Sequence, residues 1–208
     1  LAGAEGRPPV VEVNDAALAA VLAAGGVDLA KIRADTSMVI LADPGLKVMI
    51  DLKETVLKQS SAPNTIGILE GTDPKLKHEY LVYSAHMDHV GIASGKPDSI
   101  HNGADDDASG TVGVVELAEA FSRPGARPKR SILFITVSGE EKGLWGSNYF
   151  VNHPTVPLKD MVADINLDMI GRNWPDTIVA IGREHSDLGK TLEAVNAQHP
   201  ELGMAAID

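Results

Sequence analysis

Four short polar segments of this sequence hold side chains that can bind a metal ion. The first contains His86 and Asp88, the second is the aspartate run 105–107, the third is the Glu-Glu pair 140–141, and the fourth contains Asp168. Imidazole together with carboxylate is a donor set that suits zinc, with manganese or cobalt as substitutes. Two metal ions that share a carboxylate can activate a water molecule and polarise a carbonyl group. A carboxylate that binds no metal could then accept the proton of the water.

Each segment taken alone also has an ordinary structural explanation. A histidine after a strand is usually at the surface or hydrogen-bonded, and a Glu-Glu pair is usually solvated. Three aspartates can cap a helix and occupy its first turn, where the helix dipole favours them. Asp168 is harder to explain in this way, because it ends an apolar strand and a buried carboxylate needs a partner. Together the segments favour bound cations, because carboxylates gathered in one place otherwise repel one another.

The elements that would position these segments alternate between strand and helix patterns. Apolar runs typical of buried, largely parallel strands occupy residues 80–85, 131–137, 162–167 and 177–181, and helical patterns occupy 108–121, 143–151 and 186–198. This alternation predicts an α/β fold with a mixed, largely parallel central sheet and helices on both faces. The first three runs end at candidate ligands, which fits the rule that ligands bind beyond the carboxyl ends of such strands.

The N-terminal part of the sequence predicts fewer elements. Residues 15–24 predict a helix that Asn14 or Asp15 caps. The alternating pattern of residues 46–57 predicts a half-buried edge strand, with residues 64–70 as its partner.

The composition excludes several classes of protein. Of the 208 residues, 44% are hydrophobic and 23% are charged, which is typical of a globular protein rather than a disordered or fibrous one. No apolar run approaches the ~18 residues that a membrane span needs. The net charge of −11 argues against nucleic acid as the main partner. The absence of cysteine excludes disulfides and thiolate-bound zinc.

The four polar segments resemble the motifs of the co-catalytic dizinc exopeptidases, a family that includes bacterial leucyl aminopeptidase, aminopeptidase Y and glutamate carboxypeptidase. The matching stretches are SAHMDHVG at 84–91, GADDDASG at 103–110, SGEEKGLWGS at 138–147 and NLDMIG at 166–171, in the order and spacing of the family. The resemblance implies the zinc exopeptidase fold and two zinc ions in a complete site. It also implies an aminopeptidase that acts on peptides with a free amino terminus.

The resemblance further implies a role for each candidate ligand. His86 and Asp168 resemble the terminal ligands of one zinc ion, and Asp106 resembles the carboxylate that bridges both ions. Glu141 resembles a ligand of the second ion. The resemblance also implies a cis peptide bond between Asp106 and Asp107.

The resemblance implies two further roles, and one histidine ligand of the family has no counterpart in this sequence. Glu140 resembles the general base that deprotonates the water, and Asp88 resembles the group that orients the His86 ring. The family supplies another histidine opposite Glu141, from a late loop that this sequence does not reach. We therefore expect a partial catalytic domain, incomplete at its C-terminal end, whose competence as an enzyme is open. His89 and His101 lie near the site and could support the ligands or face the substrate, but a structural or surface role is the better explanation for every remaining histidine: His78, His89, His101, His153, His185 and His199.

Two other functions remain open at this stage. A carboxypeptidase or dipeptidase acting on acidic peptides could use the same metal site, with Arg172 or Arg183 binding a substrate carboxylate. A non-catalytic peptidase-like binding module is the other alternative. The retained ligands and Glu140 argue against it, because a domain without metals has no physical reason to keep clustered carboxylates.

The domain division and the cellular location are also expectations from the resemblance. Residues 8–32 resemble the tail of a protease-associated domain, so we expect residues 1–45 to belong to that domain and residues 46–208 to a partial catalytic domain. Relatives are often secreted or periplasmic, and the sequence does not contradict this location. The oligomeric state cannot be read from the sequence.

Overall fold

The computed structural model describes residues 13–34, 55–57, 59–95 and 97–207. The chain divides into two units, Leu1–Gln59 and Ser60–Asp208. Residues 46–54 of the edge strand predicted at 46–57 lie outside the described residues. Residues 55–57 are described and form no helix or strand.

The described part of the first unit contains two helices, α1 (Asp15–Ala24) and α2 (Leu29–Ala34). The helix predicted at 15–24 is confirmed, and its cap is Asn14, whose side chain accepts a hydrogen bond of 2.9 Å from the backbone N–H of Ala17. Arg33 of α2 forms two hydrogen bonds of 2.6 and 2.7 Å with the carboxylate of Asp15. This ion pair joins the start of α1 to the end of α2.

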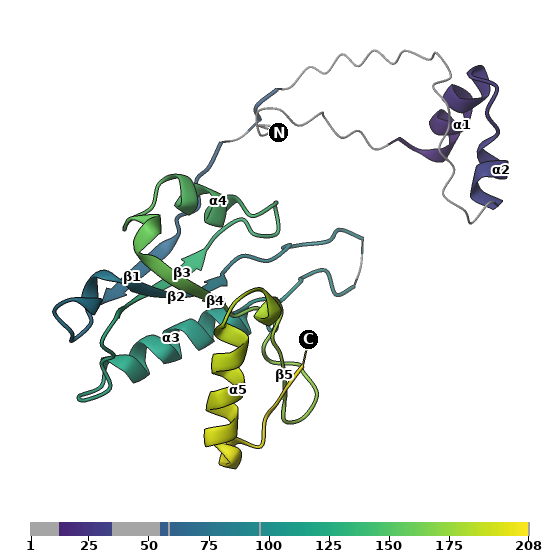
Figure 1. Ribbon diagram of the computed structural model, residues 1–208. Coiled ribbons are helices and arrows are strands. Elements are labelled where there is room, and N and C mark those ends of the chain that lie inside the picture. The colour runs from purple at the N-terminus through teal and green to yellow at the C-terminus, as the bar shows by residue number, and fades with distance from the viewer. Residues whose placement is uncertain (1–12, 35–54, 58, 96, 208) are drawn as a thin grey trace. The chain divides into compact units, whose positions relative to one another are not determined.

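A four-stranded sheet forms the centre of the second unit (Figure 1). Its strands lie in the order β1 (Thr65–Leu69), β3 (Ser131–Val137), β2 (Tyr80–His86) and β4 (Met161–Asn166). The pairs β2–β3 and β2–β4 are parallel, whereas β1 runs antiparallel to β3. The predicted mixed, largely parallel sheet is therefore confirmed. Among the described residues, β1 pairs with β3, and the pairing predicted between residues 64–70 and 46–57 falls largely on residues outside the described ones.

The central strand β3 is buried on both faces, which explains its continuous apolar sequence. Ile132 and Phe134 face α3 (Ala108–Ser122), while Leu133 and Ile135 face α4 (Trp145–Asn152). Figure 1 shows these two helices on opposite sides of the sheet, as the sequence predicts. The core on the α3 side consists of Leu69, Ala85, Val114, Ile132 and Phe134, and the core on the α4 side consists of Val82, Leu133, Ile135, Phe150 and Val156.

Two of the predicted strands occupy different environments from those expected. β4 lies at the edge of the sheet and is largely exposed. The run at 177–181 yields only β5 (Thr177–Val179), which pairs in parallel with β6 (Ala205–Ile207) in a separate two-stranded sheet. Apolar sequence predicts a strand, but the choice of pairing partner depends on distant residues.

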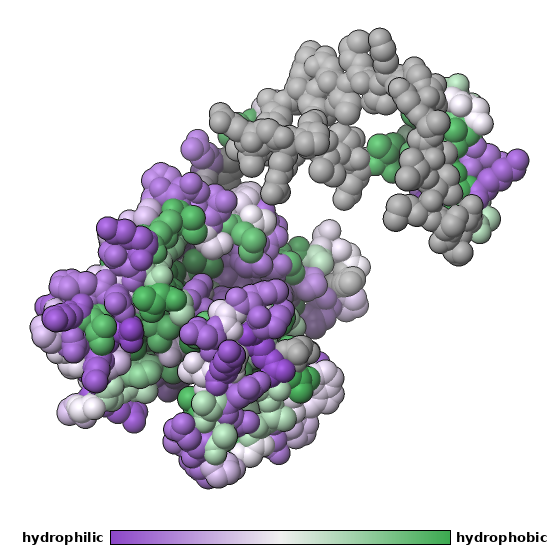
Figure 2. Space-filling model, in the orientation of Figure 1, coloured by the Kyte–Doolittle hydropathy of each residue, from purple (hydrophilic) through white to green (hydrophobic). Residues whose placement is uncertain are grey.

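The remaining elements surround these sheets. The helix predicted at 186–198 is present as α5 (Leu188–Gln198). The described residues also contain 3-10 turns at Leu76–His78, Leu158–Asp160, Arg183–His185 and Pro200–Leu202. No helix in the described part of the chain has the length and apolarity needed to span a membrane. Figure 2 shows a hollow between α4 and β4 in which hydrophobic residues are exposed.

Candidate metal centre

The candidate ligands meet at one edge of the four-stranded sheet because each follows a strand or precedes a helix there. His86 is the last residue of β2, and the Glu-Glu pair 140–141 comes shortly after β3. Asp168 lies two residues after β4, and Asp106 lies just before α3. Parallel strands carry their carboxyl ends to the same edge, so no long loop is needed to bring these side chains together.

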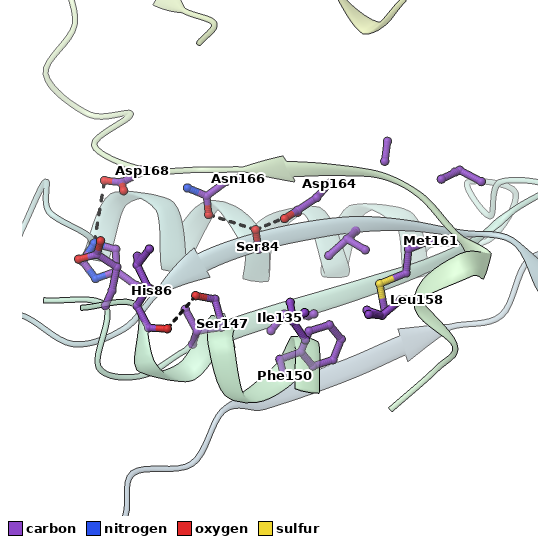
Figure 3. A pocket seen from close by; sticks show the side chains of 17 residues that line it. Ser84, His86, Ile135, Ser147, Phe150, Leu158, Met161, Asp164, Asn166 and Asp168 are labelled. Atoms are coloured by element: carbon purple, nitrogen blue, oxygen red, sulfur yellow. Dashed lines mark hydrogen bonds and ion pairs between the residues drawn. The ribbon is translucent and has the colours of Figure 1, made fainter. Parts of the chain in front are cut away.

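The first group of possible ligands consists of His86, Asp106 and Asp168, and one ligand atom of each lies within 4.8 Å of the others. Nε2 of His86 is 2.9 Å from Oδ1 of Asp106 and 4.0 Å from Oδ1 of Asp168. The His86 side chain is only 3% exposed, whereas that of Asp168 is 41% exposed. The group is therefore open to solvent on the Asp168 side (Figure 3).

A second group consists of His89, Asp106 and Glu141, again with one ligand atom of each within 4.8 Å of the others. Nδ1 of His89 is 2.6 Å from Oε1 of Glu141 and 3.7 Å from Oδ2 of Asp106. The sequence analysis did not select His89 as a ligand. Its only signal in the sequence is its position three residues after His86, within the same motif.

Asp106 belongs to both groups, and its two oxygen atoms face different partners. Oδ1 is the atom near His86, and Oδ2 is the atom near His89. The peptide bond between Asp106 and Asp107 is cis, as the resemblance implied. One carboxylate thus lies between two sets of donors, an arrangement that allows it to bridge two cations.

Asp107 is a buried carboxylate that joins three segments of the site. It is 2% exposed, and it accepts hydrogen bonds from the backbone N–H groups of His86 (3.1 Å), Gly110 (3.0 Å) and Met169 (3.3 Å). Burial raises the pKa of the Asp107 carboxyl above its ordinary value, and these three hydrogen bonds partly offset that rise. The sequence analysis named Asp107 only as one residue of the implied cis peptide bond and gave its carboxylate no role.

Asp88 contacts both His86 and the Glu-Glu pair, but with different atoms. The Nδ1 atom of His86 is 3.0 Å from the backbone oxygen of Asp88 and 3.8 Å from its carboxylate. The carboxylate instead accepts hydrogen bonds from the backbone N–H groups of Glu140 (3.0 Å) and Glu141 (3.4 Å). A nitrogen that faces a carbonyl oxygen has to donate, so Nδ1 carries the hydrogen and Nε2 of His86 keeps its lone pair for a metal ion.

The electrostatic environment shifts the pKa values of His86 and Glu140. Burial of the His86 ring by itself lowers its pKa, but the nearby negative charges of Asp107 and Asp168 outweigh this effect and leave the pKa above its ordinary value. Burial raises the pKa of the Glu140 carboxyl, and the neighbouring carboxylates of Glu141 and Asp168 add to the rise, while His86 partly offsets it. The site thus concentrates negative charge, which a cation would neutralise.

A pocket of about 470 Å³ adjoins this edge of the sheet. His86 and Asp168 lie at one end of it, apolar side chains such as Phe150 and Met161 lie further along (Figure 3), and Glu140 also lines it. A small molecule that carries both a polar and an apolar part could therefore contact the polar centre and the apolar wall together.

Comparison with known proteins gives one family and several relatives. The model of one protein family, described as Peptidase family M28, matches residues 64–202. Aminopeptidase YwaD of Bacillus subtilis is 34% identical over 126 residues, which cover 59% of this chain and 25% of that protein. Leupeptin-inactivating enzyme 1 of Streptomyces exfoliatus is 35% identical over 117 residues, which cover 56% of this chain and 24% of that enzyme. The chain thus matches about a quarter of the length of these relatives.

Solved structures of aminopeptidases share the fold. The crystal structure of the LapA aminopeptidase of Legionella pneumophila superposes with a TM-score of 0.52 at 25% identity, covering 70% of this chain and 37% of that one. A leucine aminopeptidase precursor from Bacteroides thetaiotaomicron gives a TM-score of 0.52 at 22% identity, covering 71% of this chain and 58% of that chain. At this identity the second match establishes similarity of fold alone.

Proposed function

Because this chain belongs to peptidase family M28, we propose that it forms the metal-binding part of an aminopeptidase that removes residues from the free N-terminus of a peptide. The observation that carries the proposal is the Asp106 carboxylate, whose two oxygens face two separate groups of donors. The printed names of the relatives, an aminopeptidase among them, support the choice of an N-terminal substrate.

The residues of the first group suit a zinc ion in number and in chemistry. His86, Asp106 and Asp168 offer one nitrogen and two carboxylate ligands, and zinc binds both of these ligand types with three protein ligands in catalytic sites. Asp106 and Glu141 would contribute to a second zinc ion in the neighbouring group. Zinc, when bound, supplies a Lewis acid that lowers the pKa of water and polarises a peptide carbonyl.

Glu140 is the residue that we assign as general base. Its backbone N–H is held by Asp88, and Glu140 lines the same pocket as His86 and Asp168, whose charges both act on its carboxyl. A carboxylate oxygen of Glu140 takes the proton of the attacking water and then delivers it to the nitrogen of the leaving peptide. Its raised pKa favours this role, because an efficient proton shuttle has a pKa closer to the working pH than an ordinary glutamate.

The experiment that tests the proposal compares the chain with its Glu140→Gln variant. Both are loaded with zinc and given leucine p-nitroanilide or the same substrate with an acetylated amino group. We expect the unmodified chain to cleave only the free-amine substrate, and the variant to lose about 10²–10⁴-fold in kcat with its zinc content unchanged. A chain that binds no zinc, one that cleaves the acetylated substrate as readily as the free amine, or a variant with full activity would contradict the proposal.

The finer parts of the assignment are proposed on the resemblance alone. Residues 46–208 belong to the catalytic domain, residues 1–45 to the tail of a protease-associated domain, and the enzyme acts as a secreted or periplasmic protein. Detection of the native protein in culture medium or periplasmic extract, rather than in the cytoplasmic fraction, would support the location.

A further inference from the structure

The segment that follows β2 contains a second histidine, His89, to which the proposed function assigns no role. We propose that His89 is a positioning residue, whose Nδ1–H group donates to the Oε1 atom of Glu141 and keeps that carboxylate directed toward the second metal ion. This inference rests on the proposed two-metal centre. It adds that Glu141 is held in place by a ring that does not itself bind the ion.

The short distance between His89 and Glu141 carries the inference. Nδ1 of His89 is 2.6 Å from Oε1 of Glu141, and both atoms are closed off from solvent. Neither atom has another hydrogen-bond partner among the described residues. If Nδ1 carried no hydrogen, its lone pair would face an oxygen lone pair at this distance, and the contact would be repulsive. A hydrogen on Nδ1 makes the contact attractive and serves both buried atoms.

His86 and His89 then use the same ring nitrogen for different purposes. Nδ1 of His86 faces the backbone oxygen of Asp88, which leaves Nε2 of that ring for a metal ion. Nδ1 of His89 instead faces Glu141, a carboxylate that the proposed function assigns to metal binding. Carboxylates that bind metal ions are themselves hydrogen-bonded by neighbouring groups, which fix their orientation. One histidine therefore serves as a ligand and the other as the support of a ligand.

Glu141 is held at both its backbone and its side chain by consecutive residues. The carboxylate of Asp88 accepts a hydrogen bond of 3.4 Å from the backbone N–H of Glu141, and the ring of His89 contacts the side chain. With both ends held, the Glu141 carboxylate has few orientations to lose when an ion binds. A ligand that is ordered beforehand costs less conformational entropy on binding, so the ion is bound more tightly.

The loop before Asp106 in turn holds the His89 ring. Gly103 has a φ of +64°, and a Cβ atom at this position would lie 3.0 Å from Cβ and Cγ of His89, a close approach that glycine permits. The His101 ring lies edge-on to the His89 ring, with the two centroids 6.1 Å apart. The His89 side chain is only 23% exposed. The ring is therefore confined, with Nδ1 beside Glu141.

The main alternative is that the His89 ring only fills space between the two loops. Two substitutions separate the donor from the ring. His89→Phe keeps an aromatic ring without a donor, whereas His89→Asn removes the ring but can place an amide N–H where Nδ1 lies. A donor role predicts that the first substitution harms metal binding and the second does not, and a packing role predicts the reverse. His101→Phe is the matched control, because its ring contacts His89 but belongs to neither donor group.

The test is a zinc titration of the metal-stripped 208-residue chain against a chromophoric chelator, with bound zinc measured by elemental analysis. Glu141→Ala identifies the ion of the second group as the one that this variant loses. We expect His89→Phe to bind that ion about 10–100-fold more weakly and to bind the ion of the His86 group unchanged. His89→Asn and His101→Phe should bind both ions as the unmodified chain does. Circular dichroism establishes that each variant is folded.

A second measurement follows the hydrogen on Nδ1 and needs no substitution. In the unmodified chain with ¹⁵N-labelled histidine, Nδ1 of His89 should show coupling to a bonded hydrogen both before and after zinc is added. Loss of that hydrogen on addition of zinc would overturn the positioning role, because the nitrogen would then face the ion itself.

The outcomes separate this inference from the proposal on which it rests. Unchanged binding of both ions by His89→Phe, or equal weakening in His89→Phe and His89→Asn, would overturn the role of His89 and leave the two-metal proposal standing. An unmodified chain in which no bound zinc depends on Glu141 would overturn both.

Discussion

The buried carboxylate of Asp107 accepts a hydrogen bond of 3.1 Å from the backbone N–H of His86, and so joins the segment before α3 to the end of β2. The same carboxylate holds the backbone of Met169, the residue after Asp168. Asp107 contributes no ligand atom to either donor group. Its contacts nevertheless fix the relative positions of all three members of the first group, because Asp106 is its neighbour in the chain.

Asp107→Asn should therefore destabilise the protein and weaken zinc binding together. An asparagine has one oxygen and one NH₂ group, so at least one of the two buried donors, the backbone N–H of His86 or that of Gly110, loses its acceptor. A buried unsatisfied donor costs about 1–3 kcal/mol. Urea unfolding of the metal-free chain measures this loss, and the zinc titration measures the change in affinity.

Asp105→Asn is the matched control for this prediction. Asp105 also accepts a backbone hydrogen bond, of 2.9 Å from Gly171, but that bond is exposed to solvent. Asparagine keeps one oxygen for this single donor, and water reaches the bond, so the free energy of unfolding should change by at most about 1 kcal/mol. Equal losses in the two variants would mean that the Asp107 network has no special part in the stability of the site.

Asp88→Ala should reduce catalysis more than it reduces zinc binding at the first site. The Asp88 carboxylate holds the backbone of Glu140 and Glu141, whereas the contact to His86 comes from its backbone oxygen, which alanine retains. We therefore expect kcat to fall by about 10-fold or more because the general base is displaced. Steady-state kinetics gives the change in kcat. A variant that loses the zinc of the His86 group but keeps Glu140 in place would contradict this division of roles.

Gly110→Ala should be strongly destabilising. A Cβ atom at position 110 would overlap the backbone oxygen of Leu167 and both carboxylate oxygens of Asp107, so helix α3 and the segment after β4 could not approach as they do. Overpacking of this kind typically costs about 1–3 kcal/mol. Gly67→Ala in β1 is the control, because its added Cβ would meet nothing within 4 Å. Thermal unfolding of both variants tests the difference, and equal melting temperatures would contradict the close contact.

The local parts of this structure are the parts that the sequence predicts well. Asn14 caps α1 because a side-chain acceptor just before a helix satisfies its first N–H groups, and this requires only neighbouring residues. The apolar run around Leu133 predicts a strand buried on both faces, and the structure confirms it. The convergence of His86 and Asp168 also follows from sequence, because parallel strands end at the same edge.

The features that the sequence did not predict depend on contacts between distant segments. The place of β5 in a separate sheet depends on its pairing with β6, which the apolar pattern of residues 177–181 does not encode. Asp107 became identifiable only once its three backbone donors were visible. His89 likewise has no motif of its own, and its proximity to Glu141 depends on how two loops fold toward each other.

Removal of bound zinc should lower the thermal stability of the chain. A ligand that binds only the folded state stabilises it by about 2.7 kcal/mol when its free concentration is 100 times its dissociation constant. For a chain of this length, each kcal/mol corresponds to about 2–4 °C in Tm. We therefore expect excess chelator to lower Tm by about 5–10 °C relative to the chain at that zinc concentration. Thermal unfolding followed by circular dichroism checks this shift.

Asp168→Ala makes the chelator experiment specific to the site. This variant removes a solvent-open carboxylate that accepts no hydrogen bond from a described residue, so the metal-free chain should keep its Tm. Its zinc-dependent gain in Tm should shrink, because the His86 group retains only two of its three donors. If zinc raised the Tm of the variant as much as it raises the Tm of the unmodified chain, the stabilising ion would have to bind outside the group of His86, Asp106 and Asp168.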